Sequence, residues 1–195
     1  MKKISFLIWI LAALLLVRLL VPCDAGAAEA VQRTLAPKTL GGENLGTQKT
    51  ETISIDANKT YAIVFLSTKC PCSLSHLTEL KNLTKDYPDL MMIGIHSNFD
   101  EDVAEAKTYF KVHGIEFPVL QDQANALANE LGAFKTPHAF VISKGAIVYR
   151  GGVSDHQTYA PDARKYLREA LEDLKQNRSV KTATARALGC AIPRS

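Results

Sequence analysis

The feature that most constrains the fold is Cys70-Pro71-Cys72, which stands between a strand-like and a helix-like segment. Residues 61–66 form a short apolar run typical of a β-strand, and leucines then recur with helical spacing at positions 74, 77, 80 and 83. A cysteine at such a junction lies at a helix N-terminus, where unpaired N–H groups and the helix dipole favour the thiolate. Because the thiolate attacks disulfides, peroxides and metals, the pattern predicts redox-active cysteines.

The first 27 residues have the pattern of an export signal. Lys2 and Lys3 precede an apolar run over 4–17, and Ala25-Gly26-Ala27 fits a cleavage site between small residues. If it is not cleaved, the same stretch predicts an N-terminal anchor, although Arg18 makes it a weak membrane span. In both cases we expect the folded part to be exported, to the periplasm or another extracytoplasmic space. Membrane association is expected only for the uncleaved chain.

The cysteine count supports an exchanging thiol. Cleavage would remove Cys23, where the preceding proline disfavours lipidation, and would leave Cys70, Cys72 and Cys190. An odd number of cysteines in an exported protein indicates a free or exchanging thiol and not a finished disulfide framework. The formal net charge is only +3, part of it carried by the N-terminal stretch, so we expect no nucleic-acid partner.

The rest of the chain predicts one folded domain. We expect a linker at 28–48, where Pro37 and several glycines interrupt any periodicity, a domain at 49–177, and a polar tail at 178–195 that carries Cys190. Apolar runs at 61–67 and 90–96 indicate strands, and Ser143-Lys144-Gly145 indicates a hairpin between two later strands. Strands that alternate with helices before a hairpin and a last helix predict an α/β fold, with a central mixed sheet flanked by helices.

In this order the segments resemble the exported redoxin proteins (AhpC/TSA-like) of the thioredoxin superfamily. The resemblance covers about 50–192, and its matching segments are 65–73, 114–122, 131–141, 149–155 and 189–192. It implies a single-domain thioredoxin-like fold with Cys70 in the nucleophilic position. It also implies that Thr136-Pro137 is the cis-proline loop facing this cysteine, where a substrate chain pairs with exposed backbone. His138 follows directly and is expected to join this docking surface and to tune the thiol.

The residues leave open which thiol resolves a disulfide formed at Cys70. The usual resolving position falls on Ser73, which we expect to hydrogen-bond the Cys70 sulfur. Cys72 is close in sequence, but side chains at i and i+2 of a helical turn point apart, so a Cys70–Cys72 disulfide would be strained and easily reduced. Cys190 is the other candidate, because the tail is long enough to return to the site.

These observations together predict an exported thiol–disulfide oxidoreductase that uses no cofactor and no metal. Its substrate would be a disulfide-containing protein, or a small-molecule thiol or peroxide, and a second redox partner would reduce or oxidise it. The expected catalytic residues are Cys70, Cys72, Cys190 and Ser73.

Two other functions remain as alternatives. The first is a thiol peroxidase, since Ser67 lies three residues before Cys70 as in peroxiredoxins. However, Ile63 replaces their proline and Thr136-Pro137 stands where they supply the arginine that stabilises peroxide oxygens. The second is a Cu(I)-binding chaperone of thioredoxin fold, because Cys-x-Cys with a nearby histidine is a plausible soft site.

Overall fold

The computed structural model describes residues 35–194. The expected signal peptide or anchor at 1–27 and the first part of the expected linker at 28–48 lie outside the described residues. Over the range that is described, no helix combines the length and the apolar character needed to cross a membrane.

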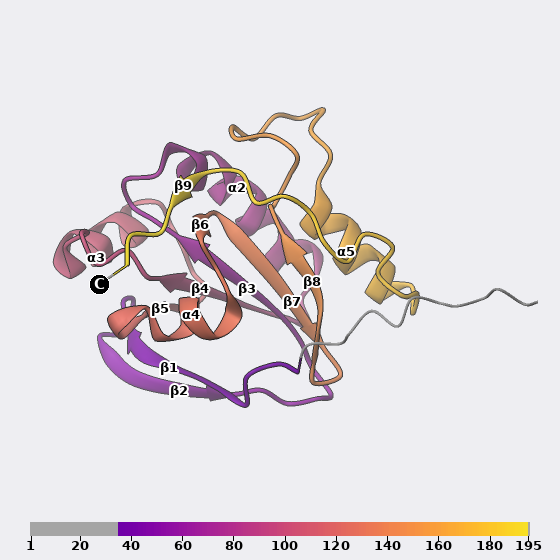
Figure 1. Ribbon diagram of the computed structural model, residues 1–195, viewed down its shortest axis with the longest axis horizontal. Coiled ribbons are helices and arrows are strands. Elements are labelled where there is room, and N and C mark those ends of the chain that lie inside the picture. The colour runs from indigo at the N-terminus through magenta and orange to yellow at the C-terminus, as the bar shows by residue number, and fades with distance from the viewer. Residues whose placement is uncertain (1–34, 195) are drawn as a thin grey trace, which may run out of the picture. The chain divides into compact units, whose positions relative to one another are not determined.

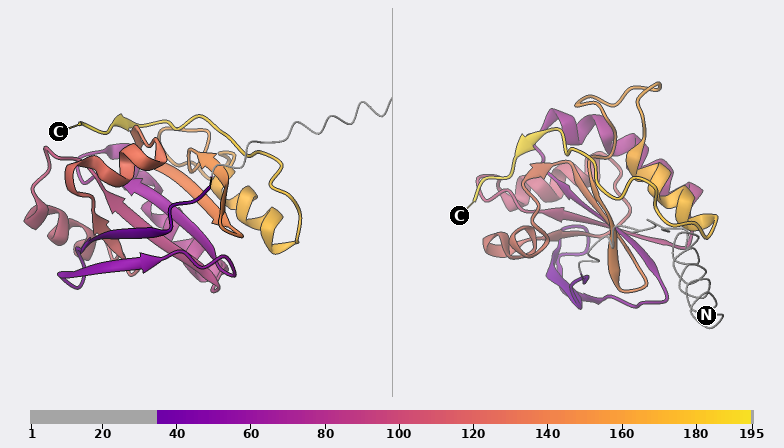
Figure 2. Two further views of the ribbon diagram at one scale, coloured as in Figure 1. Left: turned by 60° about the horizontal axis from the view of Figure 1, so that its bottom comes forward. Right: turned by 45° about the vertical axis from the view of Figure 1, so that its right-hand side comes forward.

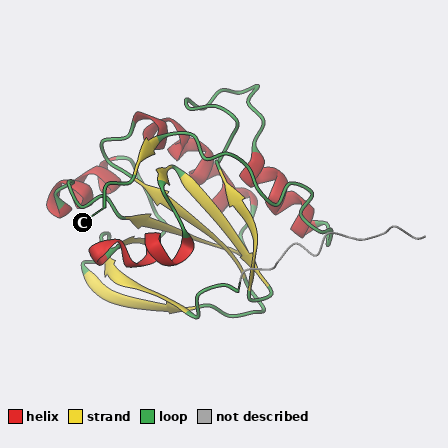
Figure 3. Cartoon of the chain, in the orientation of Figure 1, coloured by secondary structure: helices red, strands yellow, loops and turns green. Residues whose placement is uncertain are grey.

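Strands and helices alternate along most of the described chain (Figure 3). The strands are β1 (Thr39–Asn44), β2 (Lys49–Ser54), β3 (Thr60–Leu66), β4 (Leu90–His96), β5 (Val119–Gln121), β6 (Lys135–Thr136), β7 (His138–Ser143), β8 (Ala146–Gly151) and β9 (Cys190–Ala191). The helices are α2 (Pro71–Asp86), α3 (Val103–Val112), the 3-10 turn η1 (Gln123–Asn125), α4 (Ala126–Leu131) and α5 (Tyr166–Lys175).

A mixed sheet forms the centre of this region (Figure 1). Its strand order is β2-β1-β5-β4-β3-β7-β8, and β3, β4 and β5 run parallel to one another. On the other side of β3, β7 pairs antiparallel and continues into β8 through the predicted hairpin. β6 and β9 form a separate two-stranded sheet. The expected central mixed sheet is therefore confirmed.

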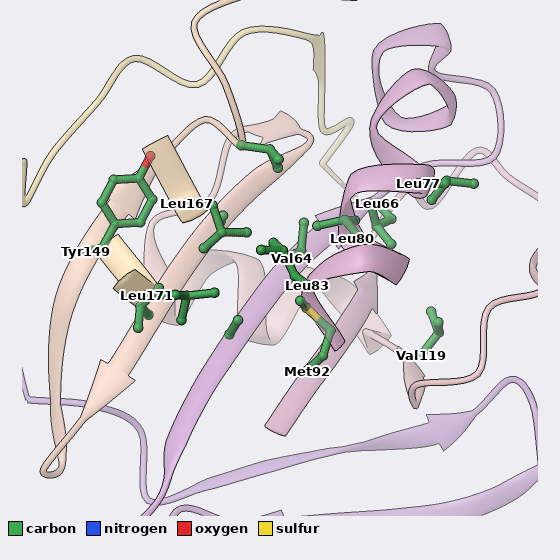
Figure 4. Close-up of a cluster of buried hydrophobic side chains, with 14 of the residues drawn as sticks. Val64, Leu66, Leu77, Leu80, Leu83, Met92, Val119, Tyr149, Leu167 and Leu171 are labelled. Carbon is green, nitrogen blue, oxygen red and sulfur yellow. The ribbon is translucent and has the colours of Figure 1, made fainter. Parts of the chain in front are cut away.

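Strand β3 separates two hydrophobic cores. Alternate side chains of a strand point to opposite faces, so Ala62, Val64 and Leu66 join one cluster and Tyr61, Ile63 and Phe65 the other. Residues of α2 and α5 cover the first face, where leucines surround Val64 (Figure 4), and α4 covers the second. Burial on both faces explains why β3 is an uninterrupted apolar run.

The spacing of leucines predicted α2 correctly, with one informative exception. Leu77, Leu80 and Leu83 are buried, whereas Leu74 is 45% exposed. Leu74 lies in the first turn of α2, where its N–H donates to the Cys70 carbonyl at 3.1 Å.

Residues 39–48 differ from the expected linker because they form β1 and its turn. β1 pairs with both β2 and β5. Gly42 allows this approach, since a Cβ on it would lie 2.5 Å from the Gln121 carbonyl oxygen. The glycines that indicated a loop are thus compatible with a strand packed tightly against its neighbour.

The C-terminal tail also carries regular structure. After α5 the chain passes back across the molecule, as the yellow segment of Figure 2 shows, and its strand β9 pairs with β6. On the way, Arg150 of β8 donates its N–H to the Ala183 carbonyl, and Ala185 donates its N–H to the Arg150 carbonyl, both at 3.0 Å. The tail is therefore held at several points before it reaches Cys190.

Candidate active site

Cys70 lies where β3 leads into α2, as predicted. It is the N-cap residue of the helix, with extended backbone angles of φ −88° and ψ 112°, and Pro71 occupies the first turn. Proline suits this position because its missing N–H would have no helical partner there. The Cys70 side chain is buried, and its S–H donates to the Thr136 carbonyl oxygen over 2.9 Å.

Three thiols meet at this point of the fold. The sulfur atoms of Cys70, Cys72 and Cys190 all lie within 4.8 Å of one another. All three cysteines are free, Cys70 and Cys72 are buried, and Cys190 is partly exposed. The structure thus brings together the three cysteines that the sequence indicated as catalytic.

The three thiols differ in acidity. Burial raises the pKa of Cys70, but hydrogen bonds, led by the one from the Cys190 side chain and including those from the Cys190 and Ser73 backbones, outweigh it and bring this pKa down to about 7. Burial and the hydrogen bond to Cys70 raise the pKa of Cys190 to about 12. Burial and the charge of Cys70 also raise the pKa of Cys72. Cys70 is accordingly the thiol most readily ionised near neutral pH.

Cys190 reaches the site through pairing of β9 with β6. Thr136 lies opposite Cys190 and Lys135 opposite Ala191 in this antiparallel pair. The Thr136-Pro137 peptide bond is cis. Ile192 extends the pairing, because its N–H donates to the Phe134 carbonyl at 3.1 Å. The loop expected to receive a substrate strand is therefore occupied by the protein's own C-terminus.

The side chains of two further predicted residues, Ser73 and His138, contact groups other than the cysteines. The Ser73 hydroxyl oxygen accepts the Ser67 backbone N–H at 3.3 Å, so it is the Ser73 backbone that contributes to the acidity of Cys70. His138 is buried between the rings of Phe134 and Phe140, with centroids 5.1 and 4.5 Å away. Burial and the nearby charge of Arg150 lower the pKa of His138 to about 4.

Sequence reasoning missed a buried carboxylate that holds the loop before Cys70. Glu101 accepts hydrogen bonds from the Ser67 hydroxyl and from the backbone N–H and hydroxyl of Thr68, the last two at 2.7 and 2.5 Å. His96 lies 3.0 Å from the same carboxylate. Although burial opposes ionisation, these hydrogen bonds lower the pKa of Glu101 to about 2.

A signal for this cluster was present in the sequence. Ser67 follows β3 and His96 ends β4, and these two strands are adjacent and parallel. Carboxyl ends of parallel strands meet at one edge of a sheet, so polar residues there are expected to lie together.

Comparison with known proteins shows the family of the chain. A family model described as Redoxin matches residues 34–167. The chain belongs to the Redoxin family. This Redoxin protein carries Cys70, Cys72 and Thr136-Pro137 within the matched region, whereas Cys190 and β9 lie beyond it.

Solved structures confirm the thioredoxin-like fold of the Redoxin protein. An uncharacterized conserved protein from Geobacillus kaustophilus is 22% identical, with a TM-score of 0.75 over 84% of this chain and 92% of that one. A hypothetical protein from Sinorhizobium meliloti is 23% identical, with a TM-score of 0.72 over 84% and 94%. The C-terminal domain of a proposed thiol-disulfide oxidoreductase from Bacteroides thetaiotaomicron is 19% identical, with a TM-score of 0.56 over 74% and 95%. No curated protein matches the chain.

Proposed function

We propose that this Redoxin protein is an exported thiol–disulfide oxidoreductase, in which Cys70 is the nucleophile and Cys190 the resolving thiol. The observation that carries the proposal is the meeting of an acidified helix N-cap thiol with two further free thiols within 4.8 Å. The name of the Bacteroides protein of similar fold supports the same chemistry. The export pattern of residues 1–27 supports a location outside the cytoplasm.

The proposed reaction has two exchange steps. The Cys70 thiolate attacks one sulfur of a substrate disulfide, forms a mixed disulfide and releases the other sulfur as a thiolate. Cys190, after losing its proton, then attacks the Cys70 sulfur. A Cys70–Cys190 disulfide forms and the substrate leaves with both of its sulfurs reduced. Two electrons pass from the two cysteines to the substrate, and the reverse sequence oxidises a substrate dithiol.

The direct contact between Cys190 and Cys70, together with the strain expected of a Cys70–Cys72 disulfide, supports Cys190 as the resolving thiol. The Cys190 side chain makes the leading hydrogen bond that acidifies Cys70, and Cys70 in turn raises the pKa of Cys190. Once Cys70 is bonded to a substrate it carries no charge, so this part of the increase disappears and both Cys190 and Cys72 ionise more easily. Cys72 remains a candidate for a second disulfide within the same cluster.

Peroxide reduction is less well supported by the site. Ser67 occupies the position of the peroxidatic hydroxyl, but its hydroxyl donates to Glu101. Thr136 meets Cys70 through its carbonyl oxygen, which accepts a hydrogen bond and cannot donate one to a peroxide.

The decisive experiment compares single cysteine variants in an insulin-reduction assay with a thiol donor. Cys70→Ser is expected to abolish activity, and Cys190→Ser to leave mixed disulfides that mass spectrometry detects on Cys70. Cys72→Ser serves as the matched control and is expected to retain most of the activity. A Cys70→Ser protein that reduces insulin at the parent rate would exclude the proposed function.

Cu(I) binding is a second candidate function, favoured by the three sulfurs. Metal–sulfur bonds of about 2.3 Å around a three-coordinate ion place the sulfurs about 4.0 Å apart, compatible with their separation here. His76 does not complete the site, since its ring nitrogens contact the Cys72 carbonyl and the Ser154 hydroxyl. Competition with a Cu(I) chelator would test this: about one equivalent bound, and lost in Cys190→Ser, supports binding. Retention of less than about a tenth of an equivalent excludes it.

A further inference from the structure

The C-terminal strand β9 occupies the edge of β6, the docking edge, where we expect a substrate segment to pair. β9 therefore shows what kind of segment this edge can hold. β9 is an extended segment with a cysteine opposite Thr136, and the Cys190 sulfur lies within 4.8 Å of the Cys70 sulfur. Main-chain pairing with an extended peptide is a common way to bind peptides, in which side-chain fit supplies the specificity. The residues beside Cys190 therefore indicate which residue types can flank the cysteine of a substrate that pairs with β6.

The position before the cysteine has room for glycine only. A Cβ on Gly189 would lie 2.0 Å from the Thr136 carbonyl oxygen, and φ of Gly189 is +153°. Both the contact with backbone and the backbone conformation disfavour any other residue. A chain that pairs with β6 in this register thus needs a glycine immediately before its cysteine.

The second position after the cysteine is apolar. Ile192 is 5% exposed and joins the hydrophobic cluster that includes Leu127, Leu131 and Ala133. The intervening Ala191 is exposed, so the residue directly after the cysteine does not need to be apolar. The edge therefore offers an apolar site for a large aliphatic side chain two residues beyond the cysteine.

We infer that the substrates are extended protein segments of the pattern Gly-Cys-x-aliphatic, which displace β9 from β6 and present their cysteine to Cys70. This inference rests on the proposed function and adds its substrate class. It also makes the tail a competitor of the substrate, because both pair with the same two residues of β6.

A peptide with an activated disulfide tests the step directly. The peptide Ala-Leu-Gly-Cys-Ala-Ile-Pro, which copies residues 187–193, is joined through its cysteine to 5-thio-2-nitrobenzoate. The Cys70 thiolate attacks the peptide sulfur, forms a Cys70–peptide disulfide and releases the coloured aromatic thiolate. The aromatic thiolate is the better leaving group because its thiol has the lower pKa. Mass spectrometry locates the peptide on Cys70.

The protein variants separate docking from chemistry. All carry Cys72→Ser and Cys190→Ser, so Cys70 is the one reactive thiol of the cluster. Ile192→Asp is added to release the tail, and Ala191→Asp is the matched control, with the same charge on the exposed neighbour. Gly189→Val releases the tail by a different contact and replaces Ile192→Asp if that variant fails to fold.

We expect the released tail to raise the rate with the copied peptide about tenfold over the control. With the tail released, peptides carrying valine for glycine or aspartate for isoleucine should react about tenfold more slowly or worse, the usual effect of one side chain in a pocket. Equal rates for all three peptides would overturn the inference and leave the proposed function standing. No adduct on Cys70 with any peptide, or with the free aromatic disulfide, would overturn the proposed function itself.

Discussion

Replacing Cys190 by alanine should change the pH dependence of Cys70 in a characteristic way. The hydrogen bond from the Cys190 side chain is the leading contribution that brings the pKa of Cys70 from an ordinary 9.0 to about 7. At pH 7 a thiol of that pKa is about half ionised, whereas one of pKa 9 is only about 1% ionised. If the whole shift were lost, the thiolate population at pH 7 would fall about 50-fold.

A more basic thiolate is also a better nucleophile, which offsets part of this loss. With a Brønsted coefficient of about 0.4–0.5, a rise of two units increases intrinsic reactivity about 6- to 10-fold. The variant should therefore react about 5- to 8-fold more slowly at pH 7, and about 6- to 10-fold faster above pH 10, where both proteins are ionised. These values are the upper limit, because the hydrogen bonds from the Cys190 and Ser73 backbones remain in place.

The assay is the rate of iodoacetamide alkylation of Cys70, followed by mass spectrometry between pH 5 and pH 11 in a Cys72→Ser background. Cys190→Ser is the matched control, because its hydroxyl can still donate a hydrogen bond and should keep the pKa low. The reasoning is supported if the rate–pH profiles of Cys190→Ala and of the parent cross, with the variant slower at pH 7 and faster above pH 10. An unchanged apparent pKa in Cys190→Ala would refute it, since Cys190 would then not acidify Cys70.

Three further outcomes follow from the same contacts. Glu101→Gln should lower the free energy of unfolding at pH 7 by about 3 kcal/mol. Because the folded-state pKa of Glu101 is lowered from 4.5 to about 2, denaturation should show this difference fading as the pH falls through that interval. His138→Phe should raise the free energy of unfolding by about 1 kcal/mol, since Nδ1 of this buried ring has no hydrogen-bond partner. The gain should grow as the pH falls from 6.5 toward 4, where the unfolded histidine takes up a proton first, and the alkylation profile of Cys70 should not move. A Cys70–Cys190 disulfide should raise the free energy of unfolding by about 4–5 kcal/mol in the chain-entropy model, measured by urea denaturation of oxidised and reduced protein.

Local patterns were sufficient to predict the centre of the fold. The apolar run of β3 and the leucine spacing of α2 each report burial, and the cysteine between them lies at the N-cap as expected. The order of the elements predicted the central mixed sheet, and the resemblance to redoxin proteins implied its thioredoxin-like arrangement. These features depend on neighbours along the chain, which is why the sequence reveals them.

Features that depend on distant partners were harder to predict. Gly42 has the same appearance in a loop as in a strand, and only its proximity to Gln121 shows that it serves close packing. β9 is two residues long and acquires its structure from β6. Glu101 is one acidic residue among many until the ends of β3 and β4 bring Ser67 and His96 to it.

The docked tail has a kinetic consequence for any substrate. A thiol tethered on the same chain acts at an effective concentration on the order of millimolar, even before docking restricts it further. In the proposed reaction, an external disulfide at micromolar concentration would therefore meet Cys70 only while β9 is detached from β6. Once a mixed disulfide has formed, the same local excess returns Cys190 to the site and expels the substrate. Under the proposed mechanism the tail would make reactions with substrate infrequent and each mixed disulfide short-lived, so the protein would not stay bonded to a partner.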